Sequence, residues 1–184
     1  MDSVLRSDLI KIAREKYPND DPSHDFQHIL RVLIIAEKIA LDEKADLDVV
    51  IPSALFHDVV NYPKNDPRAK NSSTESAELA KQLLNEITDY PKEKISDVEI
   101  SIASCSFSKG IKPDLLEAKI LQDADGLEAT GALSIMRTFA SSGIMKRSFY
   151  NPEDPLAKRR EVDDRSFALD LFFTRLLKVI DRMH

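Results

Sequence analysis

The sequence is poor in the residues that disulfide-linked and turn-rich proteins use. Its 184 residues include four glycines, one cysteine and no tryptophan. The single cysteine, Cys105, excludes an intramolecular disulfide and fits a reducing compartment. The scarcity of glycine, beside many alanine, leucine, isoleucine, lysine and glutamate residues, favours helices over a turn-rich β architecture.

Long apolar segments are also missing. The longest apolar runs, such as VLIIA at 32–36, are far shorter than the roughly 20 residues that a membrane span needs. The first ten residues mix polar and apolar side chains, unlike a secretory signal. We therefore expect a cytoplasmic protein that does not enter the membrane.

The charge balance limits the class of partner. The formal net charge of -6 argues against a nucleic-acid polymer, because binding a phosphate backbone requires clustered lysine and arginine. Hydrophobic residues make up 42% of the chain and charged residues 32%, which is typical of a folded globular protein. The length suits one sizeable core, so residues 1–184 are expected to form a single domain.

Helical periodicity recurs along nearly the whole chain, and no alternating strand pattern is convincing. The sequence therefore predicts an all-α bundle, in which the apolar final helix is part of the core or forms the interface of a homodimer. A polar loop is expected at about 143–164. The first predicted helix ends before Pro18, and the second follows an N-cap at Ser23. Further helices are predicted over 48–62 and 74–88, and others open at Pro91 and at Pro113. The segment 118–140 is helical in pattern with Gly126 and Gly131 as weak points, and a strongly apolar helix covers 167–180.

Histidine and aspartate occur where the pattern predicts a core. His28 continues an apolar stripe that includes Val32 and Ile35. His57 and Asp58 end an apolar segment, and an ionised aspartate in such surroundings is costly unless it is paired or bound to a cation. Imidazole and carboxylate ligands together suit Mn²⁺, Fe²⁺, Co²⁺, Ni²⁺ or Zn²⁺, and harder ligands would favour Mg²⁺. These residues therefore indicate a divalent metal site.

Three ordered motifs carry a resemblance to a known family. They read HDFQHILRV, LFHDVV and LQDADGLEA, and this H…HD…D pattern resembles the HD superfamily of metal-dependent phosphohydrolases. The run EAKILQDADGLEATGALSIMRTFA and the late segment LLKVIDRM resemble a bacterial and archaeal branch of predicted HD hydrolases. The resemblance covers nearly the whole chain, with an HD core at about 24–128 and a C-terminal helical extension at 129–184. It implies an HD-type helical bundle in which four metal ligands converge: His28, His57, Asp58 and Asp125.

The resemblance also implies an activity, namely hydrolysis of a phosphoester or phosphoanhydride bond in a small nucleotide. On this interpretation Asp58 accepts the proton of the attacking water. His24 and Asp25 orient the ligand shell or protonate the leaving oxygen. Lys64 and Arg68, which follow the HD motif, hold the substrate phosphate.

Simpler interpretations stay open for the residues beside the metal ligands. His24 can be an exposed residue at a helix start, and Asp25 a partner of the helix dipole. Lys64 and Arg68 lie in a polar segment, where a solvated charge is the default interpretation. The four metal ligands do not depend on these assignments.

Two positions depart from the pattern of the branch. Cys105 stands where relatives often have histidine, and Gly126 replaces the arginine of a DADR pattern. Cys105 is expected to pack as a small apolar side chain. These departures support an alternative function, a catalytically weak HD module that binds a nucleotide and regulates a partner. A purely structural helical protein would bind no metal at all.

Overall fold

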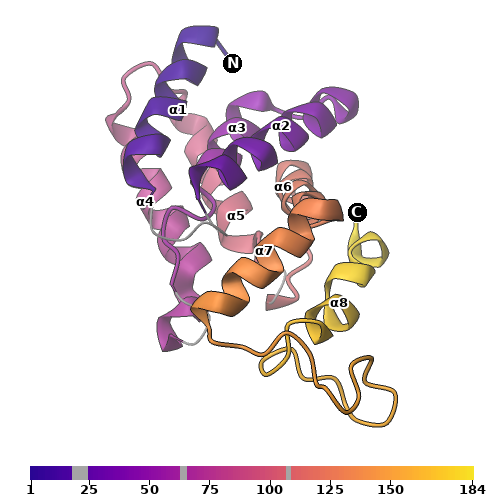
Figure 1. Ribbon diagram of the computed structural model, residues 1–184. Coiled ribbons are helices and arrows are strands. Elements are labelled where there is room, and N and C mark those ends of the chain that lie inside the picture. The colour runs from indigo at the N-terminus through magenta and orange to yellow at the C-terminus, as the bar shows by residue number, and fades with distance from the viewer. Residues whose placement is uncertain (18–24, 63–65, 107–108) are drawn as a thin grey trace.

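The computed structural model describes residues 1–17, 25–62, 66–106 and 109–184. Within these ranges the regular structure is helical, and the only bridge of β type joins Ser148 to Phe167, which confirms the all-α class. No helix in the described ranges is long and apolar enough to cross a membrane. The helices are α1 (Ser3–Lys16), α2 (Phe26–Glu43), α3 (Leu47–Phe56), α4 (Ser72–Glu86), α5 (Ile95–Ser104), α6 (Leu116–Glu128), α7 (Gly131–Ile144) and α8 (Asp170–Thr174) (Figure 1).

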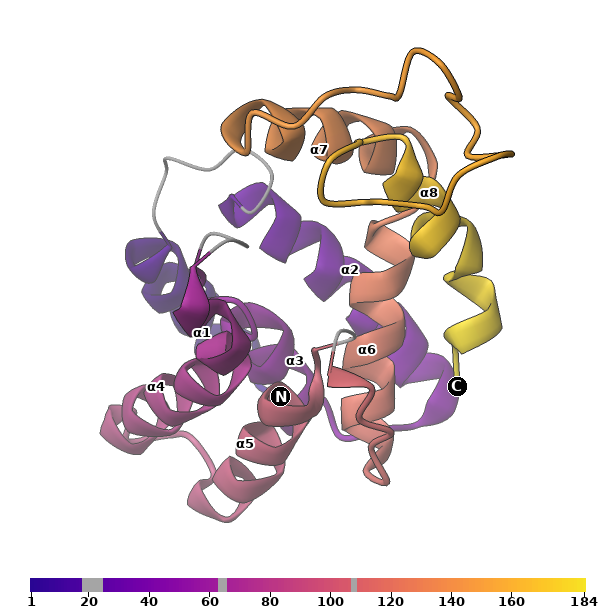
Figure 2. The ribbon, with the colours of Figure 1, turned by 90° about the horizontal axis from the view of Figure 1, so that it is seen from below.

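Helix α3 lies at the centre of the bundle. It packs against α1, α2, α4, α5 and α6, and residues 49–56 are all buried. A helix that is surrounded in this way must be apolar on every side, which explains the sequence VVIPSALF. Helices α2 and α6 pack together on one side of α3, and α4 and α5 pair on another (Figure 2). The central helix therefore delivers its C-terminal residues into the interior of the molecule.

A proline interrupts the hydrogen bonds of the central helix. Pro52 lies inside α3 and has no N–H to donate to the carbonyl of Asp48, one turn earlier. The hydroxyl of Tyr90 donates to this carbonyl oxygen at 2.7 Å, and Tyr90 is itself buried. A tertiary contact thus satisfies the backbone group that the proline leaves open.

The third predicted helix is shorter than expected. It ends at Phe56 and not near Tyr62, so His57 and Asp58 lie in the turn that follows it. The reason is a set of contacts with α4: the N–H of Val60 donates to Oγ of Ser76 at 3.0 Å, and this hydroxyl donates to the Val60 carbonyl at 3.2 Å. The backbone here finds its partners on another element, which ends the helix.

The segment predicted as helical over 118–140 forms two helices, and the break falls at one of its two expected weak points. It is divided into α6 and α7 by Gly131, whose φ of 64° lies in the left-handed region that favours glycine. The Thr130 N–H donates to the Leu127 carbonyl at 3.1 Å and closes the end of α6. The chain can therefore turn, and α7 leaves the axis of α6 (Figure 1).

Helix α7 has an unusual orientation for a surface helix. Its buried side chains are polar, namely Ser134, Thr138 and Ser142. Ile135 and Met136 are 49% and 66% exposed. The polar side of this helix therefore faces the protein, which is consistent with a polar site beneath it.

The continuous apolar helix predicted over 167–180 is not formed. The segment contains α8 and two 3₁₀ turns, Leu176–Lys178 and Ile180–Arg182. Arg175 adopts φ −134° and ψ −61°, which breaks the helix, and Nη2 of Arg182 donates to the Thr174 carbonyl at 3.3 Å. Side chains thus take the place of the missing helical hydrogen bonds.

The two helix starts expected at prolines differ from each other. Pro91 leads into the 3₁₀ turn Lys92–Lys94, and α5 follows it at Ile95. The helix after Pro113 begins three residues later, at Leu116. The N-cap expected at Ser23 lies outside the described residues, and α2 is capped by Asp25.

Candidate metal centre

His28 is positioned by the first turn of α2. Oδ1 of Asp25 accepts a hydrogen bond from the His28 N–H at 2.9 Å, which caps the helix. The His28 side chain is 1% exposed and points into the bundle. The contact that the structure gives Asp25 is thus a capping contact, and its catalytic role stays a prediction. His24 lies outside the described residues.

His57 has the tautomer that a metal ligand requires. Its Nδ1 lies 2.9 Å from the carbonyl oxygen of Ala54, and a carbonyl can only accept, so the ring proton is on Nδ1. Nε2 therefore carries a lone pair. This atom is buried and has no hydrogen-bond partner among the described residues. A divalent cation would satisfy a buried acceptor of this kind.

Two carboxylates face the two imidazoles. Oδ2 of Asp58 lies 3.9 Å from Nε2 of His28 and 3.8 Å from Nε2 of His57. Oδ1 of Asp125 lies 3.6 Å and 4.0 Å from the same two nitrogens. Atoms that each coordinate one ion at about 2.1 Å are at most about 4.2 Å apart. All four distances satisfy this limit. Among the described residues, the ligand atoms of His28, His57 and Asp125 all lie within 4.8 Å of one another, so these three fit one divalent ion, and Asp58 faces the same two nitrogens without joining this group.

Glu128 contacts Nδ1 of His28, whereas Asp58 and Asp125 face the other ring nitrogen, Nε2. Its side chain is 1% exposed, and its Oε2 is 3.0 Å from Nδ1 of His28. Burial raises the pKa of Glu128, but its interactions with His28 and with the guanidinium groups of Arg137 and Arg31 outweigh this effect and lower the pKa to about 2. Glu128 is therefore ionised at neutral pH, and the proton between it and His28 is on Nδ1. This arrangement directs Nε2 of His28 to the cluster.

The negative charges of Asp58 and Asp125 add to the effect of burial on the pKa of two neighbouring groups, Tyr17 and Cys105. Burial raises the pKa of the Tyr17 hydroxyl well above its ordinary value, and the negative charge of Asp58 raises it further. Burial also raises the pKa of the Cys105 thiol well above its ordinary value, and the charges of Asp58 and Asp125 raise it further. Both groups stay protonated at neutral pH. Cys105 is 5% exposed and packs in the core cluster, in agreement with its expected apolar role.

We expect Cys105 to resist thiol reagents in the native protein. Reaction requires local opening, and each 1.4 kcal/mol of opening free energy slows it about tenfold, so the native rate should be more than about tenfold below that of the urea-unfolded chain. The measurement is the rate of reaction with a chromogenic disulfide at pH 8, native and unfolded. Equal rates in the two states would contradict the burial of this side chain.

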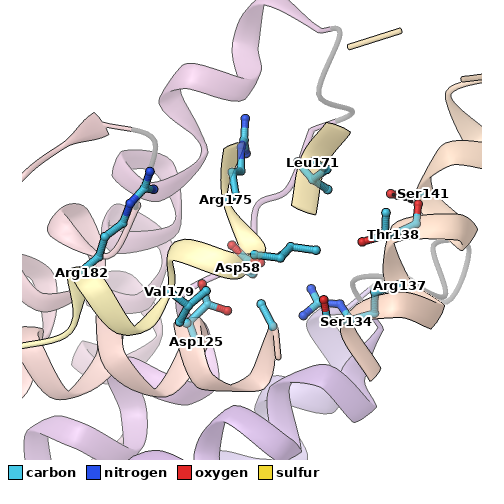
Figure 3. Close-up of a pocket in the computed structure, with 13 residues that line it drawn as sticks. Asp58, Asp125, Ser134, Arg137, Thr138, Ser141, Leu171, Arg175, Val179 and Arg182 are labelled. Carbon is cyan, nitrogen blue, oxygen red and sulfur yellow. Dashed lines mark hydrogen bonds between the residues drawn. The ribbon is translucent and has the colours of Figure 1, made fainter. Parts of the chain in front are cut away.

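A cavity of about 230 Å³ opens beside the carboxylates of the cluster. Asp58 and Asp125 line it, and most of its other lining residues come from α7 and the C-terminal segment (Figure 3). The cavity thus combines two carboxylates of the candidate metal centre with basic and hydroxyl side chains, which suits an anion bound next to a cation. Its basic and hydroxyl lining residues are Ser134, Arg137, Thr138, Ser141, Arg175 and Arg182.

Arg68 is engaged away from this cavity. Its guanidinium pairs with Asp66, with Nη2 to Oδ2 at 2.7 Å, and its Cζ lies 4.4 Å from the centre of the Tyr62 ring. Arg68 does not line the cavity beside Asp58. Lys64 lies outside the described residues, so the substrate contacts expected of these two residues stay predictions.

Sequence reasoning missed Glu128 and Arg137. A signal for Glu128 was present, because it follows Asp125 by three positions and residues at this spacing share a helix face. A signal for Arg137 was also present in the polar positions Ser134 and Thr138, which recur at helical spacing on an otherwise apolar segment. Glu128 contacts both His28 and Arg137, and Arg137 lines the cavity.

The HD domain family matches residues 25–130 of this chain. This range covers more than half of the sequence and contains all four residues of the cluster. The chain therefore belongs to the HD domain family, a family of metal-dependent phosphohydrolases.

Individual relatives agree with this assignment. Bacillus subtilis YpgQ is 31% identical over 189 residues, which span 100% of this chain and 83% of YpgQ. The structure of YpgQ in complex with ADP matches with a TM-score of 0.69 and 30% identity, over 97% of this chain and 83% of that one. A Lactobacillus plantarum protein matches with a TM-score of 0.76 and 26% identity, over 100% and 85%. A Bacillus thuringiensis protein named as an HD-superfamily hydrolase matches with a TM-score of 0.65 and 26% identity, over 98% and 83%.

Proposed function

We propose that this protein hydrolyses a phosphoester or phosphoanhydride bond of a small nucleotide and uses a divalent metal ion to do so. The observation that carries the proposal is the meeting of His28, His57, Asp58 and Asp125 at the end of a cavity that also contains arginines. The ADP complex of the relative YpgQ supports a nucleotide as the ligand. The negative net charge of the chain is consistent with a small anion that is recognised locally.

The residues of the site divide the work between them. His28, His57, Asp58 and Asp125 would hold the ion, which supplies a Lewis acid for a phosphoryl oxygen and lowers the pKa of water. Asp58 is 29% exposed toward the cavity and can accept the proton of the attacking water. The cavity arginines offset the negative charge of the phosphate.

The proposal is tested by a screen of nucleoside mono-, di- and triphosphates with Mn²⁺, Mg²⁺, Fe²⁺, Co²⁺, Ni²⁺ and Zn²⁺. We expect metal-dependent release of phosphate or pyrophosphate from at least one nucleotide, loss of this activity in a chelator, and loss in the Asp58→Ala variant. Elemental analysis of the purified wild type should find a divalent metal. Nucleotide binding without turnover in every combination would favour the regulatory module, and a protein that binds no metal would exclude both functions.

Other expectations stay predictions. They are the cytoplasmic location, the lack of a nucleic-acid polymer partner, the homodimer, and the division into an HD core at 24–128 and an extension at 129–184. Leu177 and Ile180 are 70% and 79% exposed, so the C-terminal segment does offer apolar side chains to a second copy. Sedimentation of the purified protein at several concentrations would measure its oligomeric state.

A further inference from the structure

Glu128 contacts both a proposed metal ligand, His28, and an arginine of the cavity wall, Arg137. Oε2 lies 3.0 Å from Nδ1 of the metal ligand His28, and the same oxygen pairs with Nη1 of Arg137, which lines the cavity. Oε1 accepts from Nε and Nη2 of Arg31 at 2.8 and 2.7 Å. One buried carboxylate therefore joins α2, α6 and α7 at the point where the cluster meets the cavity.

Each contact of Oε2 fixes a different group. The contact with His28 keeps the proton on Nδ1 and the lone pair on Nε2, which lies 3.6 Å from Oδ1 of Asp125. The contact with Arg137 holds a guanidinium whose side chain is 17% exposed at the wall of the cavity. A rigid arginine binds phosphate with a smaller loss of side-chain entropy than a flexible one.

We propose that Glu128 is a positioning residue that orients His28 for the metal ion and Arg137 for the phosphate of the substrate through one shared oxygen. The inference rests on the proposed function, because it assigns the two groups to the cation and the anion of that site. It predicts that a substitution of Glu128 weakens the binding of both the metal ion and the phosphate, although Glu128 neither lines the cavity nor belongs to the group of proposed metal ligands.

A buried ion pair can also be purely structural, and the chain offers a matched control for this alternative. The Asp170 side chain is 0% exposed and pairs with Arg160, with Nη2 to Oδ1 at 2.8 Å. Asp170 contacts no residue of the metal cluster in these interactions and does not line the cavity. The Asp170→Asn variant should therefore lose stability as Glu128→Gln does, with no change in ligand affinity.

The experiment measures two affinities by isothermal titration calorimetry on the full chain: Mn²⁺ without nucleotide, and ADP in a chelator. We expect Glu128→Gln to weaken Mn²⁺ binding about 10- to 100-fold, since this is the usual effect of removing the partner of a ligating histidine. ADP binding should weaken about tenfold, as for the loss of a charged hydrogen bond. Asp170→Asn should change both affinities less than about twofold.

A second variant protects the test against a failure to fold. Glu128→Asp keeps the negative charge beside the two arginines and withdraws the carboxylate by one methylene, so it should weaken both ligands in the same direction. If folded Glu128 variants bind Mn²⁺ or ADP as the wild type does, the inference is overturned. The nucleotide screen and the titrations can fail independently. If the wild type hydrolyses no nucleotide but the Glu128 variants still lose affinity for both Mn²⁺ and ADP, the proposed function is wrong and the positioning role of Glu128 is supported.

Discussion

Asp58→Asn should lower metal-dependent turnover by about 10²–10⁴-fold, the range expected when a general base is removed. The amide keeps the shape of the side chain but cannot accept the proton of water, and it is a weaker ligand than a carboxylate. Oδ2 of Asp58 lies within 3.9 Å of Nε2 of both histidines, so the substitution acts directly beside these two proposed ligands. The measurement is kcat at saturating metal, with circular dichroism to show that the fold is kept.

Asp123→Asn is the matched control for this prediction. Asp123 lies two positions before Asp125 on α6, and its carboxylate accepts from the His184 N–H at 3.2 and 3.1 Å, away from the metal cluster. Its variant should keep kcat within about threefold of the wild type, as expected for a substitution distant from the chemistry. If Asp58→Asn kept as much activity as Asp123→Asn, the role of the cluster in catalysis would have to be abandoned.

Three of the four proposed metal ligands, His28, His57 and Asp58, could be predicted because each lies in a local pattern that physical chemistry makes unusual, whereas Asp125 was predicted through the resemblance to the HD superfamily. His28 extends an apolar stripe, and His57 and Asp58 directly follow the apolar residues of α3, where a charge is costly without a partner. The distances between them could not be predicted, because these depend on how α2 and α6 pack against α3. The structure brings the ligand atoms of His28, His57 and Asp125 within 4.8 Å of one another.

The role of Glu128 depends on contacts that no local pattern contains. Arg31 is separated from it by 97 positions, and the two meet only because α2 and α6 pair in the bundle. The predicted end of α3 was wrong for the same reason, because it depends on contacts with another helix. Val59 and Val60 continue its apolar pattern, but Ser76 on α4 takes the Val60 backbone groups. Sequence periodicity predicts which side of an element is buried more reliably than where that element ends.

Leu33→Ala should lower the free energy of unfolding by about 2–5 kcal/mol, the usual cost of truncating a fully buried leucine. Leu33 is 1% exposed on α2, in the core cluster that this helix shares with its neighbours. The measurement is urea unfolding followed by circular dichroism. A lower midpoint with an unchanged slope would show a loss of stability without a change in the surface exposed on unfolding.

Ile34, the next residue along α2, provides a control for this prediction. Ile34 is 64% exposed, so Ile34→Ala should change the free energy of unfolding by no more than about 0.5 kcal/mol. The rotation of α2 that buries Leu33 and exposes Ile34 is the same rotation that buries His28 at 1% exposure. Equal costs for the two substitutions would mean that α2 is turned differently about its axis, and His28 would then not face Asp58 and Asp125.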